Sequence, residues 1–271
     1  MAETNKNKGL IASILGLPND DPKKTIIVAF LLCLVCSILV STSAVMLKPQ
    51  QIANKQADIK KNILAVTGLL DESSDVNTLF EQFEVKIVDL ETGEYSDIDP
   101  NSYDQRKASG DPAQSIKLSQ QQDIANIGRR ANLAKVYLLK EDDKIKRVVL
   151  PIHGYGLWST LYGFVSLESD FNTIGGLQFY SHAETPGLGG EVDNPKWRKQ
   201  WQGKKIFNDA GELEIEVIRG HVDFQVEGSE HKVDGLSGAT LTSRGVSHLV
   251  NFWLGDDGFG PYLKKMSEAE K

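Results

Sequence analysis

The first regular pattern along the chain is an apolar stretch, residues 25–47, that contains neither a charged residue nor a proline. As a helix it would be about 35 Å long at roughly 1.5 Å per residue, enough to cross a hydrocarbon core of about 30 Å. A cleaved signal peptide is the alternative, with Thr42 and Ala44 marking a small-residue cleavage site. We favour a membrane anchor because the apolar character continues through Met46 and Leu47.

A second helical pattern follows the apolar stretch directly. Aliphatic residues recur at helical spacing from Ile52 to Leu70, which predicts an amphipathic helix that continues the anchor outward. Gly68 and the acidic segment D-E-S-S-D at residues 71–75 interrupt it. The sequence of residues 76–83 predicts a short second helix.

From residue 85 onward the period changes to that of strands. Apolar and polar residues alternate, and turn residues separate the segments. The predicted strands are two segments within 85–96 joined at Thr92 and Gly93, two within 134–154 with a turn near Asp142 and Asp143, and single strands within 161–168 and 175–184. Residues 98–125 are polar, and we interpret them as a long surface loop or a frayed helix.

The clearest hairpin pattern lies later in the chain. Residues 211–218 and 221–228 each alternate apolar and polar positions, and Gly220 falls between them. Asn194 followed by Pro195 predicts the start of a helix. Runs of strands with scattered helices indicate an α+β fold: a single N-terminal transmembrane helix, then a mixed, largely antiparallel sheet domain with peripheral helices.

Composition excludes several function classes. The chain has 271 residues and a net charge of −7, without the basic stripe that nucleic-acid binding needs. It contains neither a G-x-G-x-x-G turn nor a G-K-[ST] loop, so the usual phosphate cradles of dinucleotide and nucleotide enzymes are missing. We predict neither a catalytic residue nor a metal site.

The two cysteines, Cys33 and Cys36, both lie inside the apolar stretch. On a helix they share one face, yet two ligands do not close a metal site. A redox role and a plain apolar role both remain open for them. Basic residues flank the stretch equally on both sides, so charge alone does not orient it. The simpler topology places the short N-terminus inside and the large domain outside.

Hydroxyl side chains crowd the segment before the last strong helix pattern. Apolar residues at helical spacing from Val246 to Leu254 predict a helix that ends at Gly255. Its N-terminus falls among Thr240 to Ser243, where free amides favour an anion such as phosphate. A hydroxyl-rich helix cap is the alternative.

The sequence of this segment resembles a known motif. D-G-L-S-G-A-T at residues 234–240, followed by L-T-S, resembles the flavinylation motif of the FMN-binding domain family, in which the last Thr is esterified to the FMN phosphate. The resemblance implies that Thr240 carries the flavin. The cofactor-binding residues that it implies around Thr240 are Asp234, Ser237, Gly238, Ala239, Leu241 and Thr242.

Two further segments carry the same resemblance. H-A-E-T-P-G-L-G-G-E at residues 182–191 is similar to the family's E-T-P-G-L-G loop, and residues 154–168 are similar to its G-x-G-L-W segment. The residues that these segments would add to the flavin pocket are Glu184, Thr185, Gly187, Leu188 and Trp158. A plain tight turn explains the same glycines, and Trp158 could equally belong to the core.

Over almost its full length the chain resembles the C subunits of the Na+-translocating NADH:quinone reductases. The resemblance implies one covalent FMN per chain, which relays electrons between redox centres towards quinone and has no catalysis of its own. It implies a single-pass protein of the cell inner membrane, with a short cytoplasmic N-terminus (1–24), a transmembrane helix (25–47), a connecting helix and first part of the periplasmic domain (48–149), and an FMN-binding domain (150–271).

The implied partners are the other membrane and peripheral subunits of the complex, including a second flavin subunit, and a flavin transferase that installs the cofactor. Two alternatives remain. One is the flavoprotein subunit of an ion-translocating ferredoxin:NAD+ oxidoreductase, which shares the S-G-A-T motif. The other is a membrane-anchored assembly or binding module without flavin, which an unmodified Thr240 would support.

Overall fold

The computed structural model describes residues 16, 18, 21–71 and 75–269. Its contacts divide the chain into two compact units, Met1–Ala57 and Asp58–Lys271. Most of the predicted N-terminal segment 1–24 lies outside the described residues.

The predicted anchor and the amphipathic helix that follows it form one helix, α2 (Pro22–Val66). Its apolar window has a mean hydropathy of 2.7 and none of it is buried, so by length and composition the helix can cross a membrane. Cys33 and Cys36 are exposed on it as free thiols. At its other end, within the second unit, Ile63 and Leu64 are buried, which explains the amphipathic pattern there.

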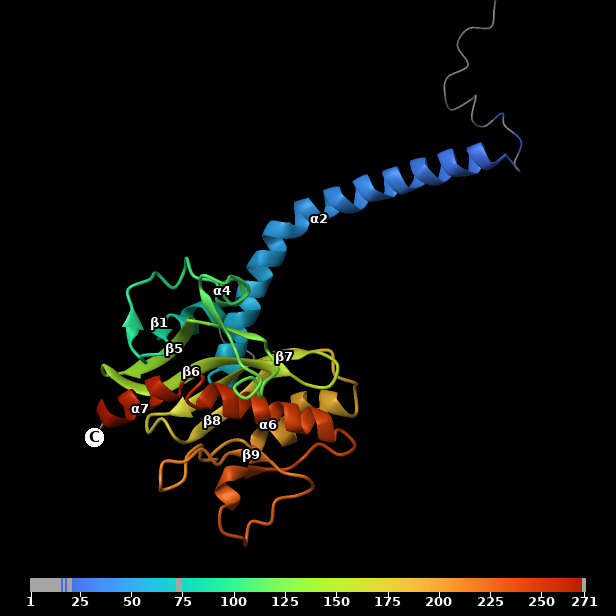
Figure 1. Cartoon of the computed structure of the whole chain (residues 1–271). Helices are drawn as coiled ribbons and strands as arrows, with labels where there is room; N and C mark the ends of the chain where they lie inside the picture. The colour runs from blue at the N-terminus through green and yellow to red at the C-terminus, as the bar shows by residue number, and fades with distance from the viewer. Residues whose placement is uncertain (1–15, 17, 19–20, 72–74, 270–271) are drawn as a thin grey trace, which may run out of the picture. The chain divides into compact units, whose positions relative to one another are not determined.

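The second unit is built on an antiparallel sheet. In the described part of the chain six strands pair in the order β2-β1-β5-β6-β7-β8, of which Figure 1 labels all but β2. The strands are β1 (Phe83–Asp89), β2 (Tyr95–Ser96), β5 (Leu133–Glu141), β6 (Lys144–Tyr155), β7 (Thr160–Glu168) and β8 (Ile174–Ser181). The predicted turns are confirmed, because Gly93 lies between β1 and β2, and Asp142 and Asp143 between β5 and β6.

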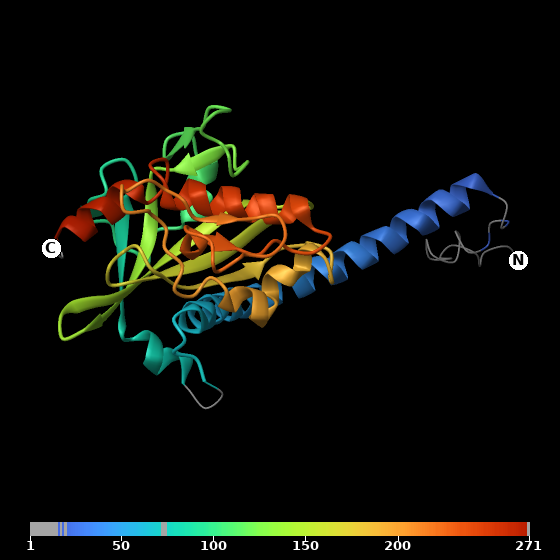
Figure 2. The same cartoon turned by 90° about the horizontal axis from the view of Figure 1, so that it is seen from below.

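The two faces of this sheet are covered by different helices. On β6, Val148 and Leu150 face a core shared with α6 (Thr240–Leu254), whereas Val149 faces a core shared with the end of α2. Figure 2 shows α6 and α7 (Gly260–Ala269) along one face and the last turns of α2 along the other. Strict alternation of side chains along a strand therefore lets this sheet bury both faces.

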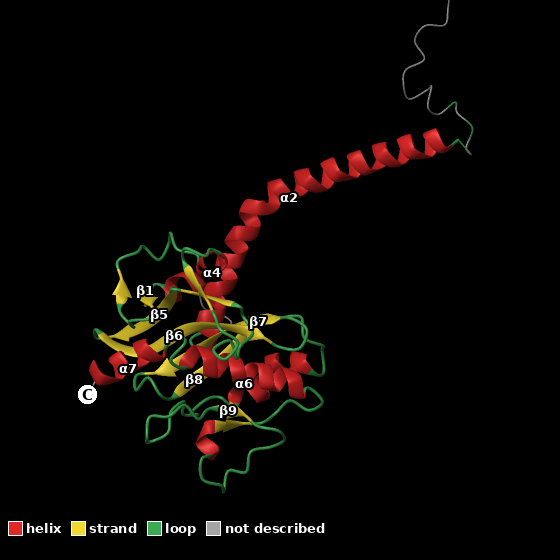
Figure 3. Cartoon of the chain, viewed as in Figure 1, coloured by secondary structure: helices red, strands yellow, loops and turns green. Residues whose placement is uncertain are grey.

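Short elements complete the unit. They are α3 (Val76–Phe80), α4 (Gln105–Gly110), β3 (Ser115–Lys117), β4 (Arg129–Ala131), η1 (Gly189–Asp193), α5 (Pro195–Lys199), β9 (Glu216–Val217), η2 (Ser229–His231) and β10 (Lys232–Val233). Figure 3 shows how much of the chain between β8 and α6 is loop. The predicted helices 76–83 and at Asn194–Pro195 are confirmed as α3 and α5, and the amide of Lys196 donates to the side chain of Asn194. This is a mixed, largely antiparallel α+β architecture, as predicted.

The predicted hairpin of residues 211–228 is wrong. Only Glu216 and Val217 form a strand there, and it pairs in parallel with β10. Val217 is buried, whereas Phe224 in the second alternating segment is 73% exposed. Alternation alone did not identify the strand partner.

Residues 98–125 hold more structure than the predicted loop or frayed helix. They include α4, whose N-terminus is capped by Asp104, and β3, which pairs with β4. Tyr103 and Ala108 are buried against Ile87 of the sheet. The segment is therefore a packed part of the second unit.

Candidate functional site

Three segments that are far apart in the sequence meet at the start of α6. They are the turn between β6 and β7, the loop that follows β8, and the loop that leads into Thr240. The carboxylate of Glu184 joins them, because Oε1 accepts hydrogen bonds from the amides of Leu157 (3.1 Å), Trp158 (3.0 Å) and Ser159 (3.3 Å). Its Oε2 accepts a 2.6 Å hydrogen bond from the hydroxyl of Thr242.

Glu184 is held as a buried anion. Burial by itself pushes the pKa of this carboxyl upward, but the hydrogen bonds from Thr242 and the backbone amides outweigh it and leave the pKa below its ordinary value. Hydrogen bonds to an ionised acceptor are among the stronger ones in proteins. Glu184 is thus a fixed, charged anchor for the surrounding backbone.

The N-terminus of α6 has no side-chain cap. The residue at the N-cap position is Ala239, which makes no side-chain hydrogen bond to the first-turn amides. The neighbouring hydroxyls have other partners: Thr242 bonds to Glu184, and the Ser243 hydroxyl accepts the amide of Leu236 at 2.9 Å. The hydroxyl-rich cap is therefore not what the structure contains, and Thr240, the first residue of the helix, is exposed at an end where first-turn amides lack intrahelical partners.

Close packing between the loops depends on glycine. Gly238 has φ +71°, and a Cβ on it would lie 3.0 Å from Leu188 Cδ2. At Gly189 a Cβ would come within 2.5 Å of the Thr242 hydroxyl oxygen. The predicted loop residues Thr185 and Gly187 are exposed at the rim of this arrangement.

Large apolar side chains are exposed around Thr240. Trp158 is 64% exposed, Leu241 52% and Leu188 44%. The alternative that Trp158 belongs to the core is therefore wrong. An aromatic ring that is mostly exposed on a turn held by a buried carboxylate is typical of a ligand or partner contact.

Asp234 has a different setting from the other predicted site residues. Its carboxylate accepts the amide of Val222 at 2.7 Å and contacts His221 Nδ1 at 2.9 Å, and its carbonyl accepts Trp197 Nε1 at 2.8 Å. Burial raises the pKa of Asp234, but the hydrogen bonds from His221 and Val222 outweigh it, so the pKa lies below the ordinary value of 3.8. Asp234 ties the loop before Thr240 to α5 and to the loop at 221–222.

A cavity of about 400 Å³ that the sequence did not reveal opens beside Thr240. Arg219, Arg244, His248, Asn251 and the acidic Glu216 are among its lining residues. Within the described residues neither arginine has an ion pair, and the buried Oδ1 of Asn251 has no hydrogen-bond partner. The sequence signal was present, since Thr240, Arg244 and His248 recur every four residues on one face of the helix.

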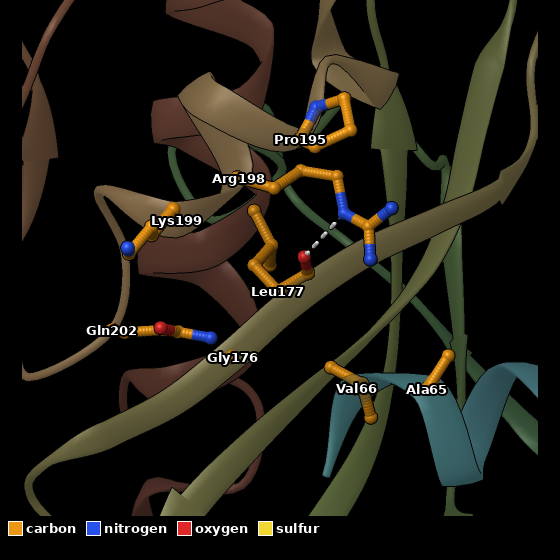
Figure 4. A pocket seen from close by; sticks show the side chains of 8 residues that line it. All are labelled: Ala65, Val66, Gly176, Leu177, Pro195, Arg198, Lys199 and Gln202. Atoms are coloured by element: carbon orange, nitrogen blue, oxygen red, sulfur yellow. Dashed lines mark hydrogen bonds between the residues drawn. The ribbon is translucent and has the colours of Figure 1, made fainter. Parts of the chain in front are cut away.

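A second cavity, of about 380 Å³, lies away from this site, between the end of α2, β8 and α5. Figure 4 shows Arg198 crossing it, with Nε donating to the carbonyl of Leu177 at 3.4 Å. None of the predicted site residues lines it. The site therefore belongs to the surface around Thr240.

The fold and this surface define an FMN-binding flavoprotein domain, since the FMN-binding domain family matches residues 156–255. The chain is 53% identical over 93% of its length to the C subunit of the Na+-translocating NADH-quinone reductase of Vibrio anguillarum, covering 97% of that protein. It is 48% identical to the corresponding protein of Pseudomonas aeruginosa, covering 91% of this chain and 97% of that protein. The chain belongs to the family of C subunits of this enzyme complex.

Solved structures agree with this assignment. The crystal structure of Shewanella oneidensis NqrC matches with a TM-score of 0.73 at 36% identity, covering 80% of this chain and 99% of that one. The C subunit from Parabacteroides distasonis matches with a TM-score of 0.61 at 28% identity, covering 82% of this chain and 97% of that one. Both the fold and the family are thereby established.

Proposed function

We propose that this chain carries FMN as a phosphoester on Thr240 and relays electrons between redox centres towards quinone in a Na+-translocating NADH-quinone reductase. The observation that supports this most is the position of Thr240. It is the exposed first residue of an uncapped helix, near exposed apolar side chains and beside the cavity that Arg219 and Arg244 help to line.

The phosphate side of the site is supplied by positive charge. The first-turn amides of α6 and the positive end of its dipole favour an anion at this point. Arg244 lies one helical turn beyond Thr240, and Arg219 lines the same cavity. We propose that these two guanidinium groups hold the negative charge that the phosphoester retains.

The flavin ring side of the site is apolar. Trp158, Leu188 and Leu241 offer exposed apolar surface around Thr240, and the loop from Thr185 to Gly189 offers hydrogen-bonding groups. When bound, FMN supplies the electron-accepting and electron-donating chemistry, and this chain's residues orient it and tune its potential. The Thr185 hydroxyl and Gly187 are proposed contacts of the ring or its side chain.

The remaining part of the proposal concerns the membrane and the partners. We propose that residues 25–47 of α2 cross the cell inner membrane once, with 1–24 in the cytoplasm and the rest, including the FMN-binding domain 150–271, in the periplasm. The partners would be the other subunits, among them a second flavin subunit, and a flavin transferase acting on Thr240. The match over 97% of the Vibrio anguillarum protein favours this complex over a ferredoxin:NAD+ oxidoreductase.

Intact-mass measurement of the full chain, produced with and without a co-expressed flavin transferase, tests the proposal. We expect a mass gain equal to FMN minus one water, and flavin fluorescence that survives denaturation. Both are lost in Thr240→Ala. If Thr240→Ala still carries covalent flavin, Thr240 is not the attachment residue and the flavin must lie on another exposed hydroxyl.

A further inference from the structure

The carboxylate of Glu184 is the point where the turn that carries Trp158 is joined to α6. One oxygen accepts three consecutive amides, those of residues 157–159, and the other accepts the hydroxyl of Thr242, two residues beyond Thr240. Glu184 itself is only 5% exposed. Its carboxylate is therefore committed to the protein rather than open to a ligand.

The surrounding backbone leaves room for little besides this carboxylate. A Cβ on Gly156 would lie 2.7 Å from Glu184 Oε1, and a Cβ on Gly189 would lie 2.7 Å from Oε2. The two glycines thus admit the charged group between the turn and the loop. An acceptor placed elsewhere would leave the three amides of residues 157–159 without this partner.

Trp158 has no comparable support from its own side chain. It is 64% exposed, so packing contributes little to its position, and its backbone amide is held by Glu184 at 3.0 Å. The carboxylate bonds to the turn on one side and to α6 on the other, and it acts beside a direct contact, since a Cβ on Gly245 of α6 would lie 2.6 Å from the carbonyl oxygen of Tyr155. This is a mechanical link between an exposed aromatic surface and the proposed attachment residue.

We propose that Glu184 is a positioning residue for the flavin site, which fixes the Trp158 turn against α6 and thereby places the indole for contact with the flavin ring. The inference rests on the proposed attachment of FMN to Thr240. It assigns Glu184 a role through Trp158 rather than a direct contact with the cofactor. Thr242 shares this role, since its hydroxyl completes the link on the helix side.

The first experiment needs no flavin and uses hydrogen exchange on the full-length chain in detergent. In Glu184→Gln an amide group replaces one oxygen, so the charge-assisted bonds to residues 157–159 weaken. We expect exchange of the peptide containing these residues to quicken by about tenfold or more, which corresponds to about 1.4 kcal/mol. Glu191→Gln is the matched control, because that carboxylate lies in the same loop and bonds only to Asn194.

The second experiment uses the flavin-loaded chain and reads the visible absorption spectrum, the circular dichroism of the flavin and its reduction potential. We expect Glu184→Gln to keep covalent FMN on Thr240 but to shift these signals, and Thr242→Val to shift them less. In a Trp158→Phe background the Glu184→Gln change should have little further effect, since contacting residues that act as one unit are not additive. Glu184→Asp, which keeps the charge, should restore part of the wild-type signal.

Two outcomes overturn the inference. One is unchanged exchange at residues 157–159 in Glu184→Gln. The other is faster exchange with an unchanged flavin spectrum and potential, which would leave Glu184 a purely structural role. If Glu184→Gln does not fold, Glu184→Asp and Thr242→Val carry the same comparison. A wild-type chain without covalent flavin would instead contradict the proposed function, while the exchange experiment would still report on the link.

Discussion

Leu188 and Gly238 contact each other across two loops that are fifty residues apart, and a Cβ added to Gly238 would lie 3.0 Å from Leu188 Cδ2. The contact joins the loop after β8 to the residues that lead into Thr240. Gly238 also has φ +71°, a conformation that side chains other than glycine rarely adopt. The position therefore needs glycine for its backbone conformation and for the close approach of Leu188.

We expect Gly238→Ala to lower both stability and flavin attachment. The positive φ should cost about 1 kcal/mol, and the crowded Leu188 side chain must also move. Because this displaces the residues just before Thr240, the fraction of chain that carries covalent FMN should fall. Thermal unfolding and intact mass measure the two effects.

Gly211→Ala provides the matched control for that prediction. Gly211 has φ +78°, and a Cβ on it would meet nothing within 4 Å. It should therefore lose a similar amount of stability without any change in flavin attachment. Equal attachment in the two variants would contradict the importance of the Leu188 contact.

A second prediction concerns Leu188 itself. It is 44% exposed, so Leu188→Ala should change the free energy of unfolding little and leave the bond to Thr240 intact. Removing apolar cover from the flavin ring favours its charged reduced form and should raise the reduction potential. A rise of roughly 10–20 mV corresponds to about 0.5–1 kcal/mol for two electrons.

The control for Leu188→Ala is Ile116→Ala, at an exposed position on β3, which should leave the reduction potential unchanged. Identical redox titrations of the two variants would show that Leu188 does not contact the flavin ring.

Much of the fold follows from local patterns that the structure confirms. The apolar stretch and its amphipathic continuation became one helix, and each predicted strand from residue 85 to residue 184 is present in the sheet. The strands and the end of the helix bury their apolar positions against neighbours in the second unit, whereas the apolar stretch itself is exposed. The 211–228 segment failed because pairing is a non-local property: Val217 packs in the core and its strand partner comes from residues 232–233.

From the sequence, only the motifs of the site could be predicted, not the contacts of their side chains. Sequence resemblance named Thr240 and the loop at Glu184, but residue types do not reveal which carboxylate oxygen faces which amide. Asp234 and Glu184 therefore looked like cofactor ligands, although the structure gives both carboxylates partners within the protein. Helical spacing could have placed Arg244 beside Thr240, but Arg219 comes from a separate segment that only the fold brings to the cavity.

A third prediction concerns how the stability of the fold depends on acidic pH. The pKa of Asp234 is lowered in the folded chain, because bonds from His221 and Val222 outweigh the opposing effect of burial. A lowered pKa contributes stability above the unfolded value of about 3.9, and that contribution is lost as pH falls below it. Asp234→Asn should therefore reduce stability by about 1–2 kcal/mol at pH 7, and the difference should shrink below about pH 4.

Chemical denaturation of wild type and Asp234→Asn at several pH values measures this difference. Asp209→Asn is the matched control, since Asp209 is exposed in a nearby loop, and its free energy of unfolding should follow wild type at every pH. A difference between wild type and Asp234→Asn that stays constant down to pH 3 would show that the carboxylate charge is not what holds the loop.

The last prediction distinguishes binding of the FMN phosphate from binding of the flavin ring. Before attachment, the chain should bind free FMN more tightly than riboflavin, because only FMN carries the charge that Arg219 and Arg244 face in the cavity beside Thr240. Removing one guanidinium in Arg244→Gln should weaken FMN binding by about tenfold, or about 1.4 kcal/mol, and leave riboflavin binding unchanged. The preference for FMN should also decrease as salt is added, since exposed charges are screened.

Fluorescence titration of the unmodified chain measures both ligands. The control is Lys196→Gln, because Lys196 is an exposed cation on α5 outside the cavity. If Arg244→Gln and Lys196→Gln bind FMN equally well, the cavity does not hold the phosphate, and the amides of α6 supply its binding alone.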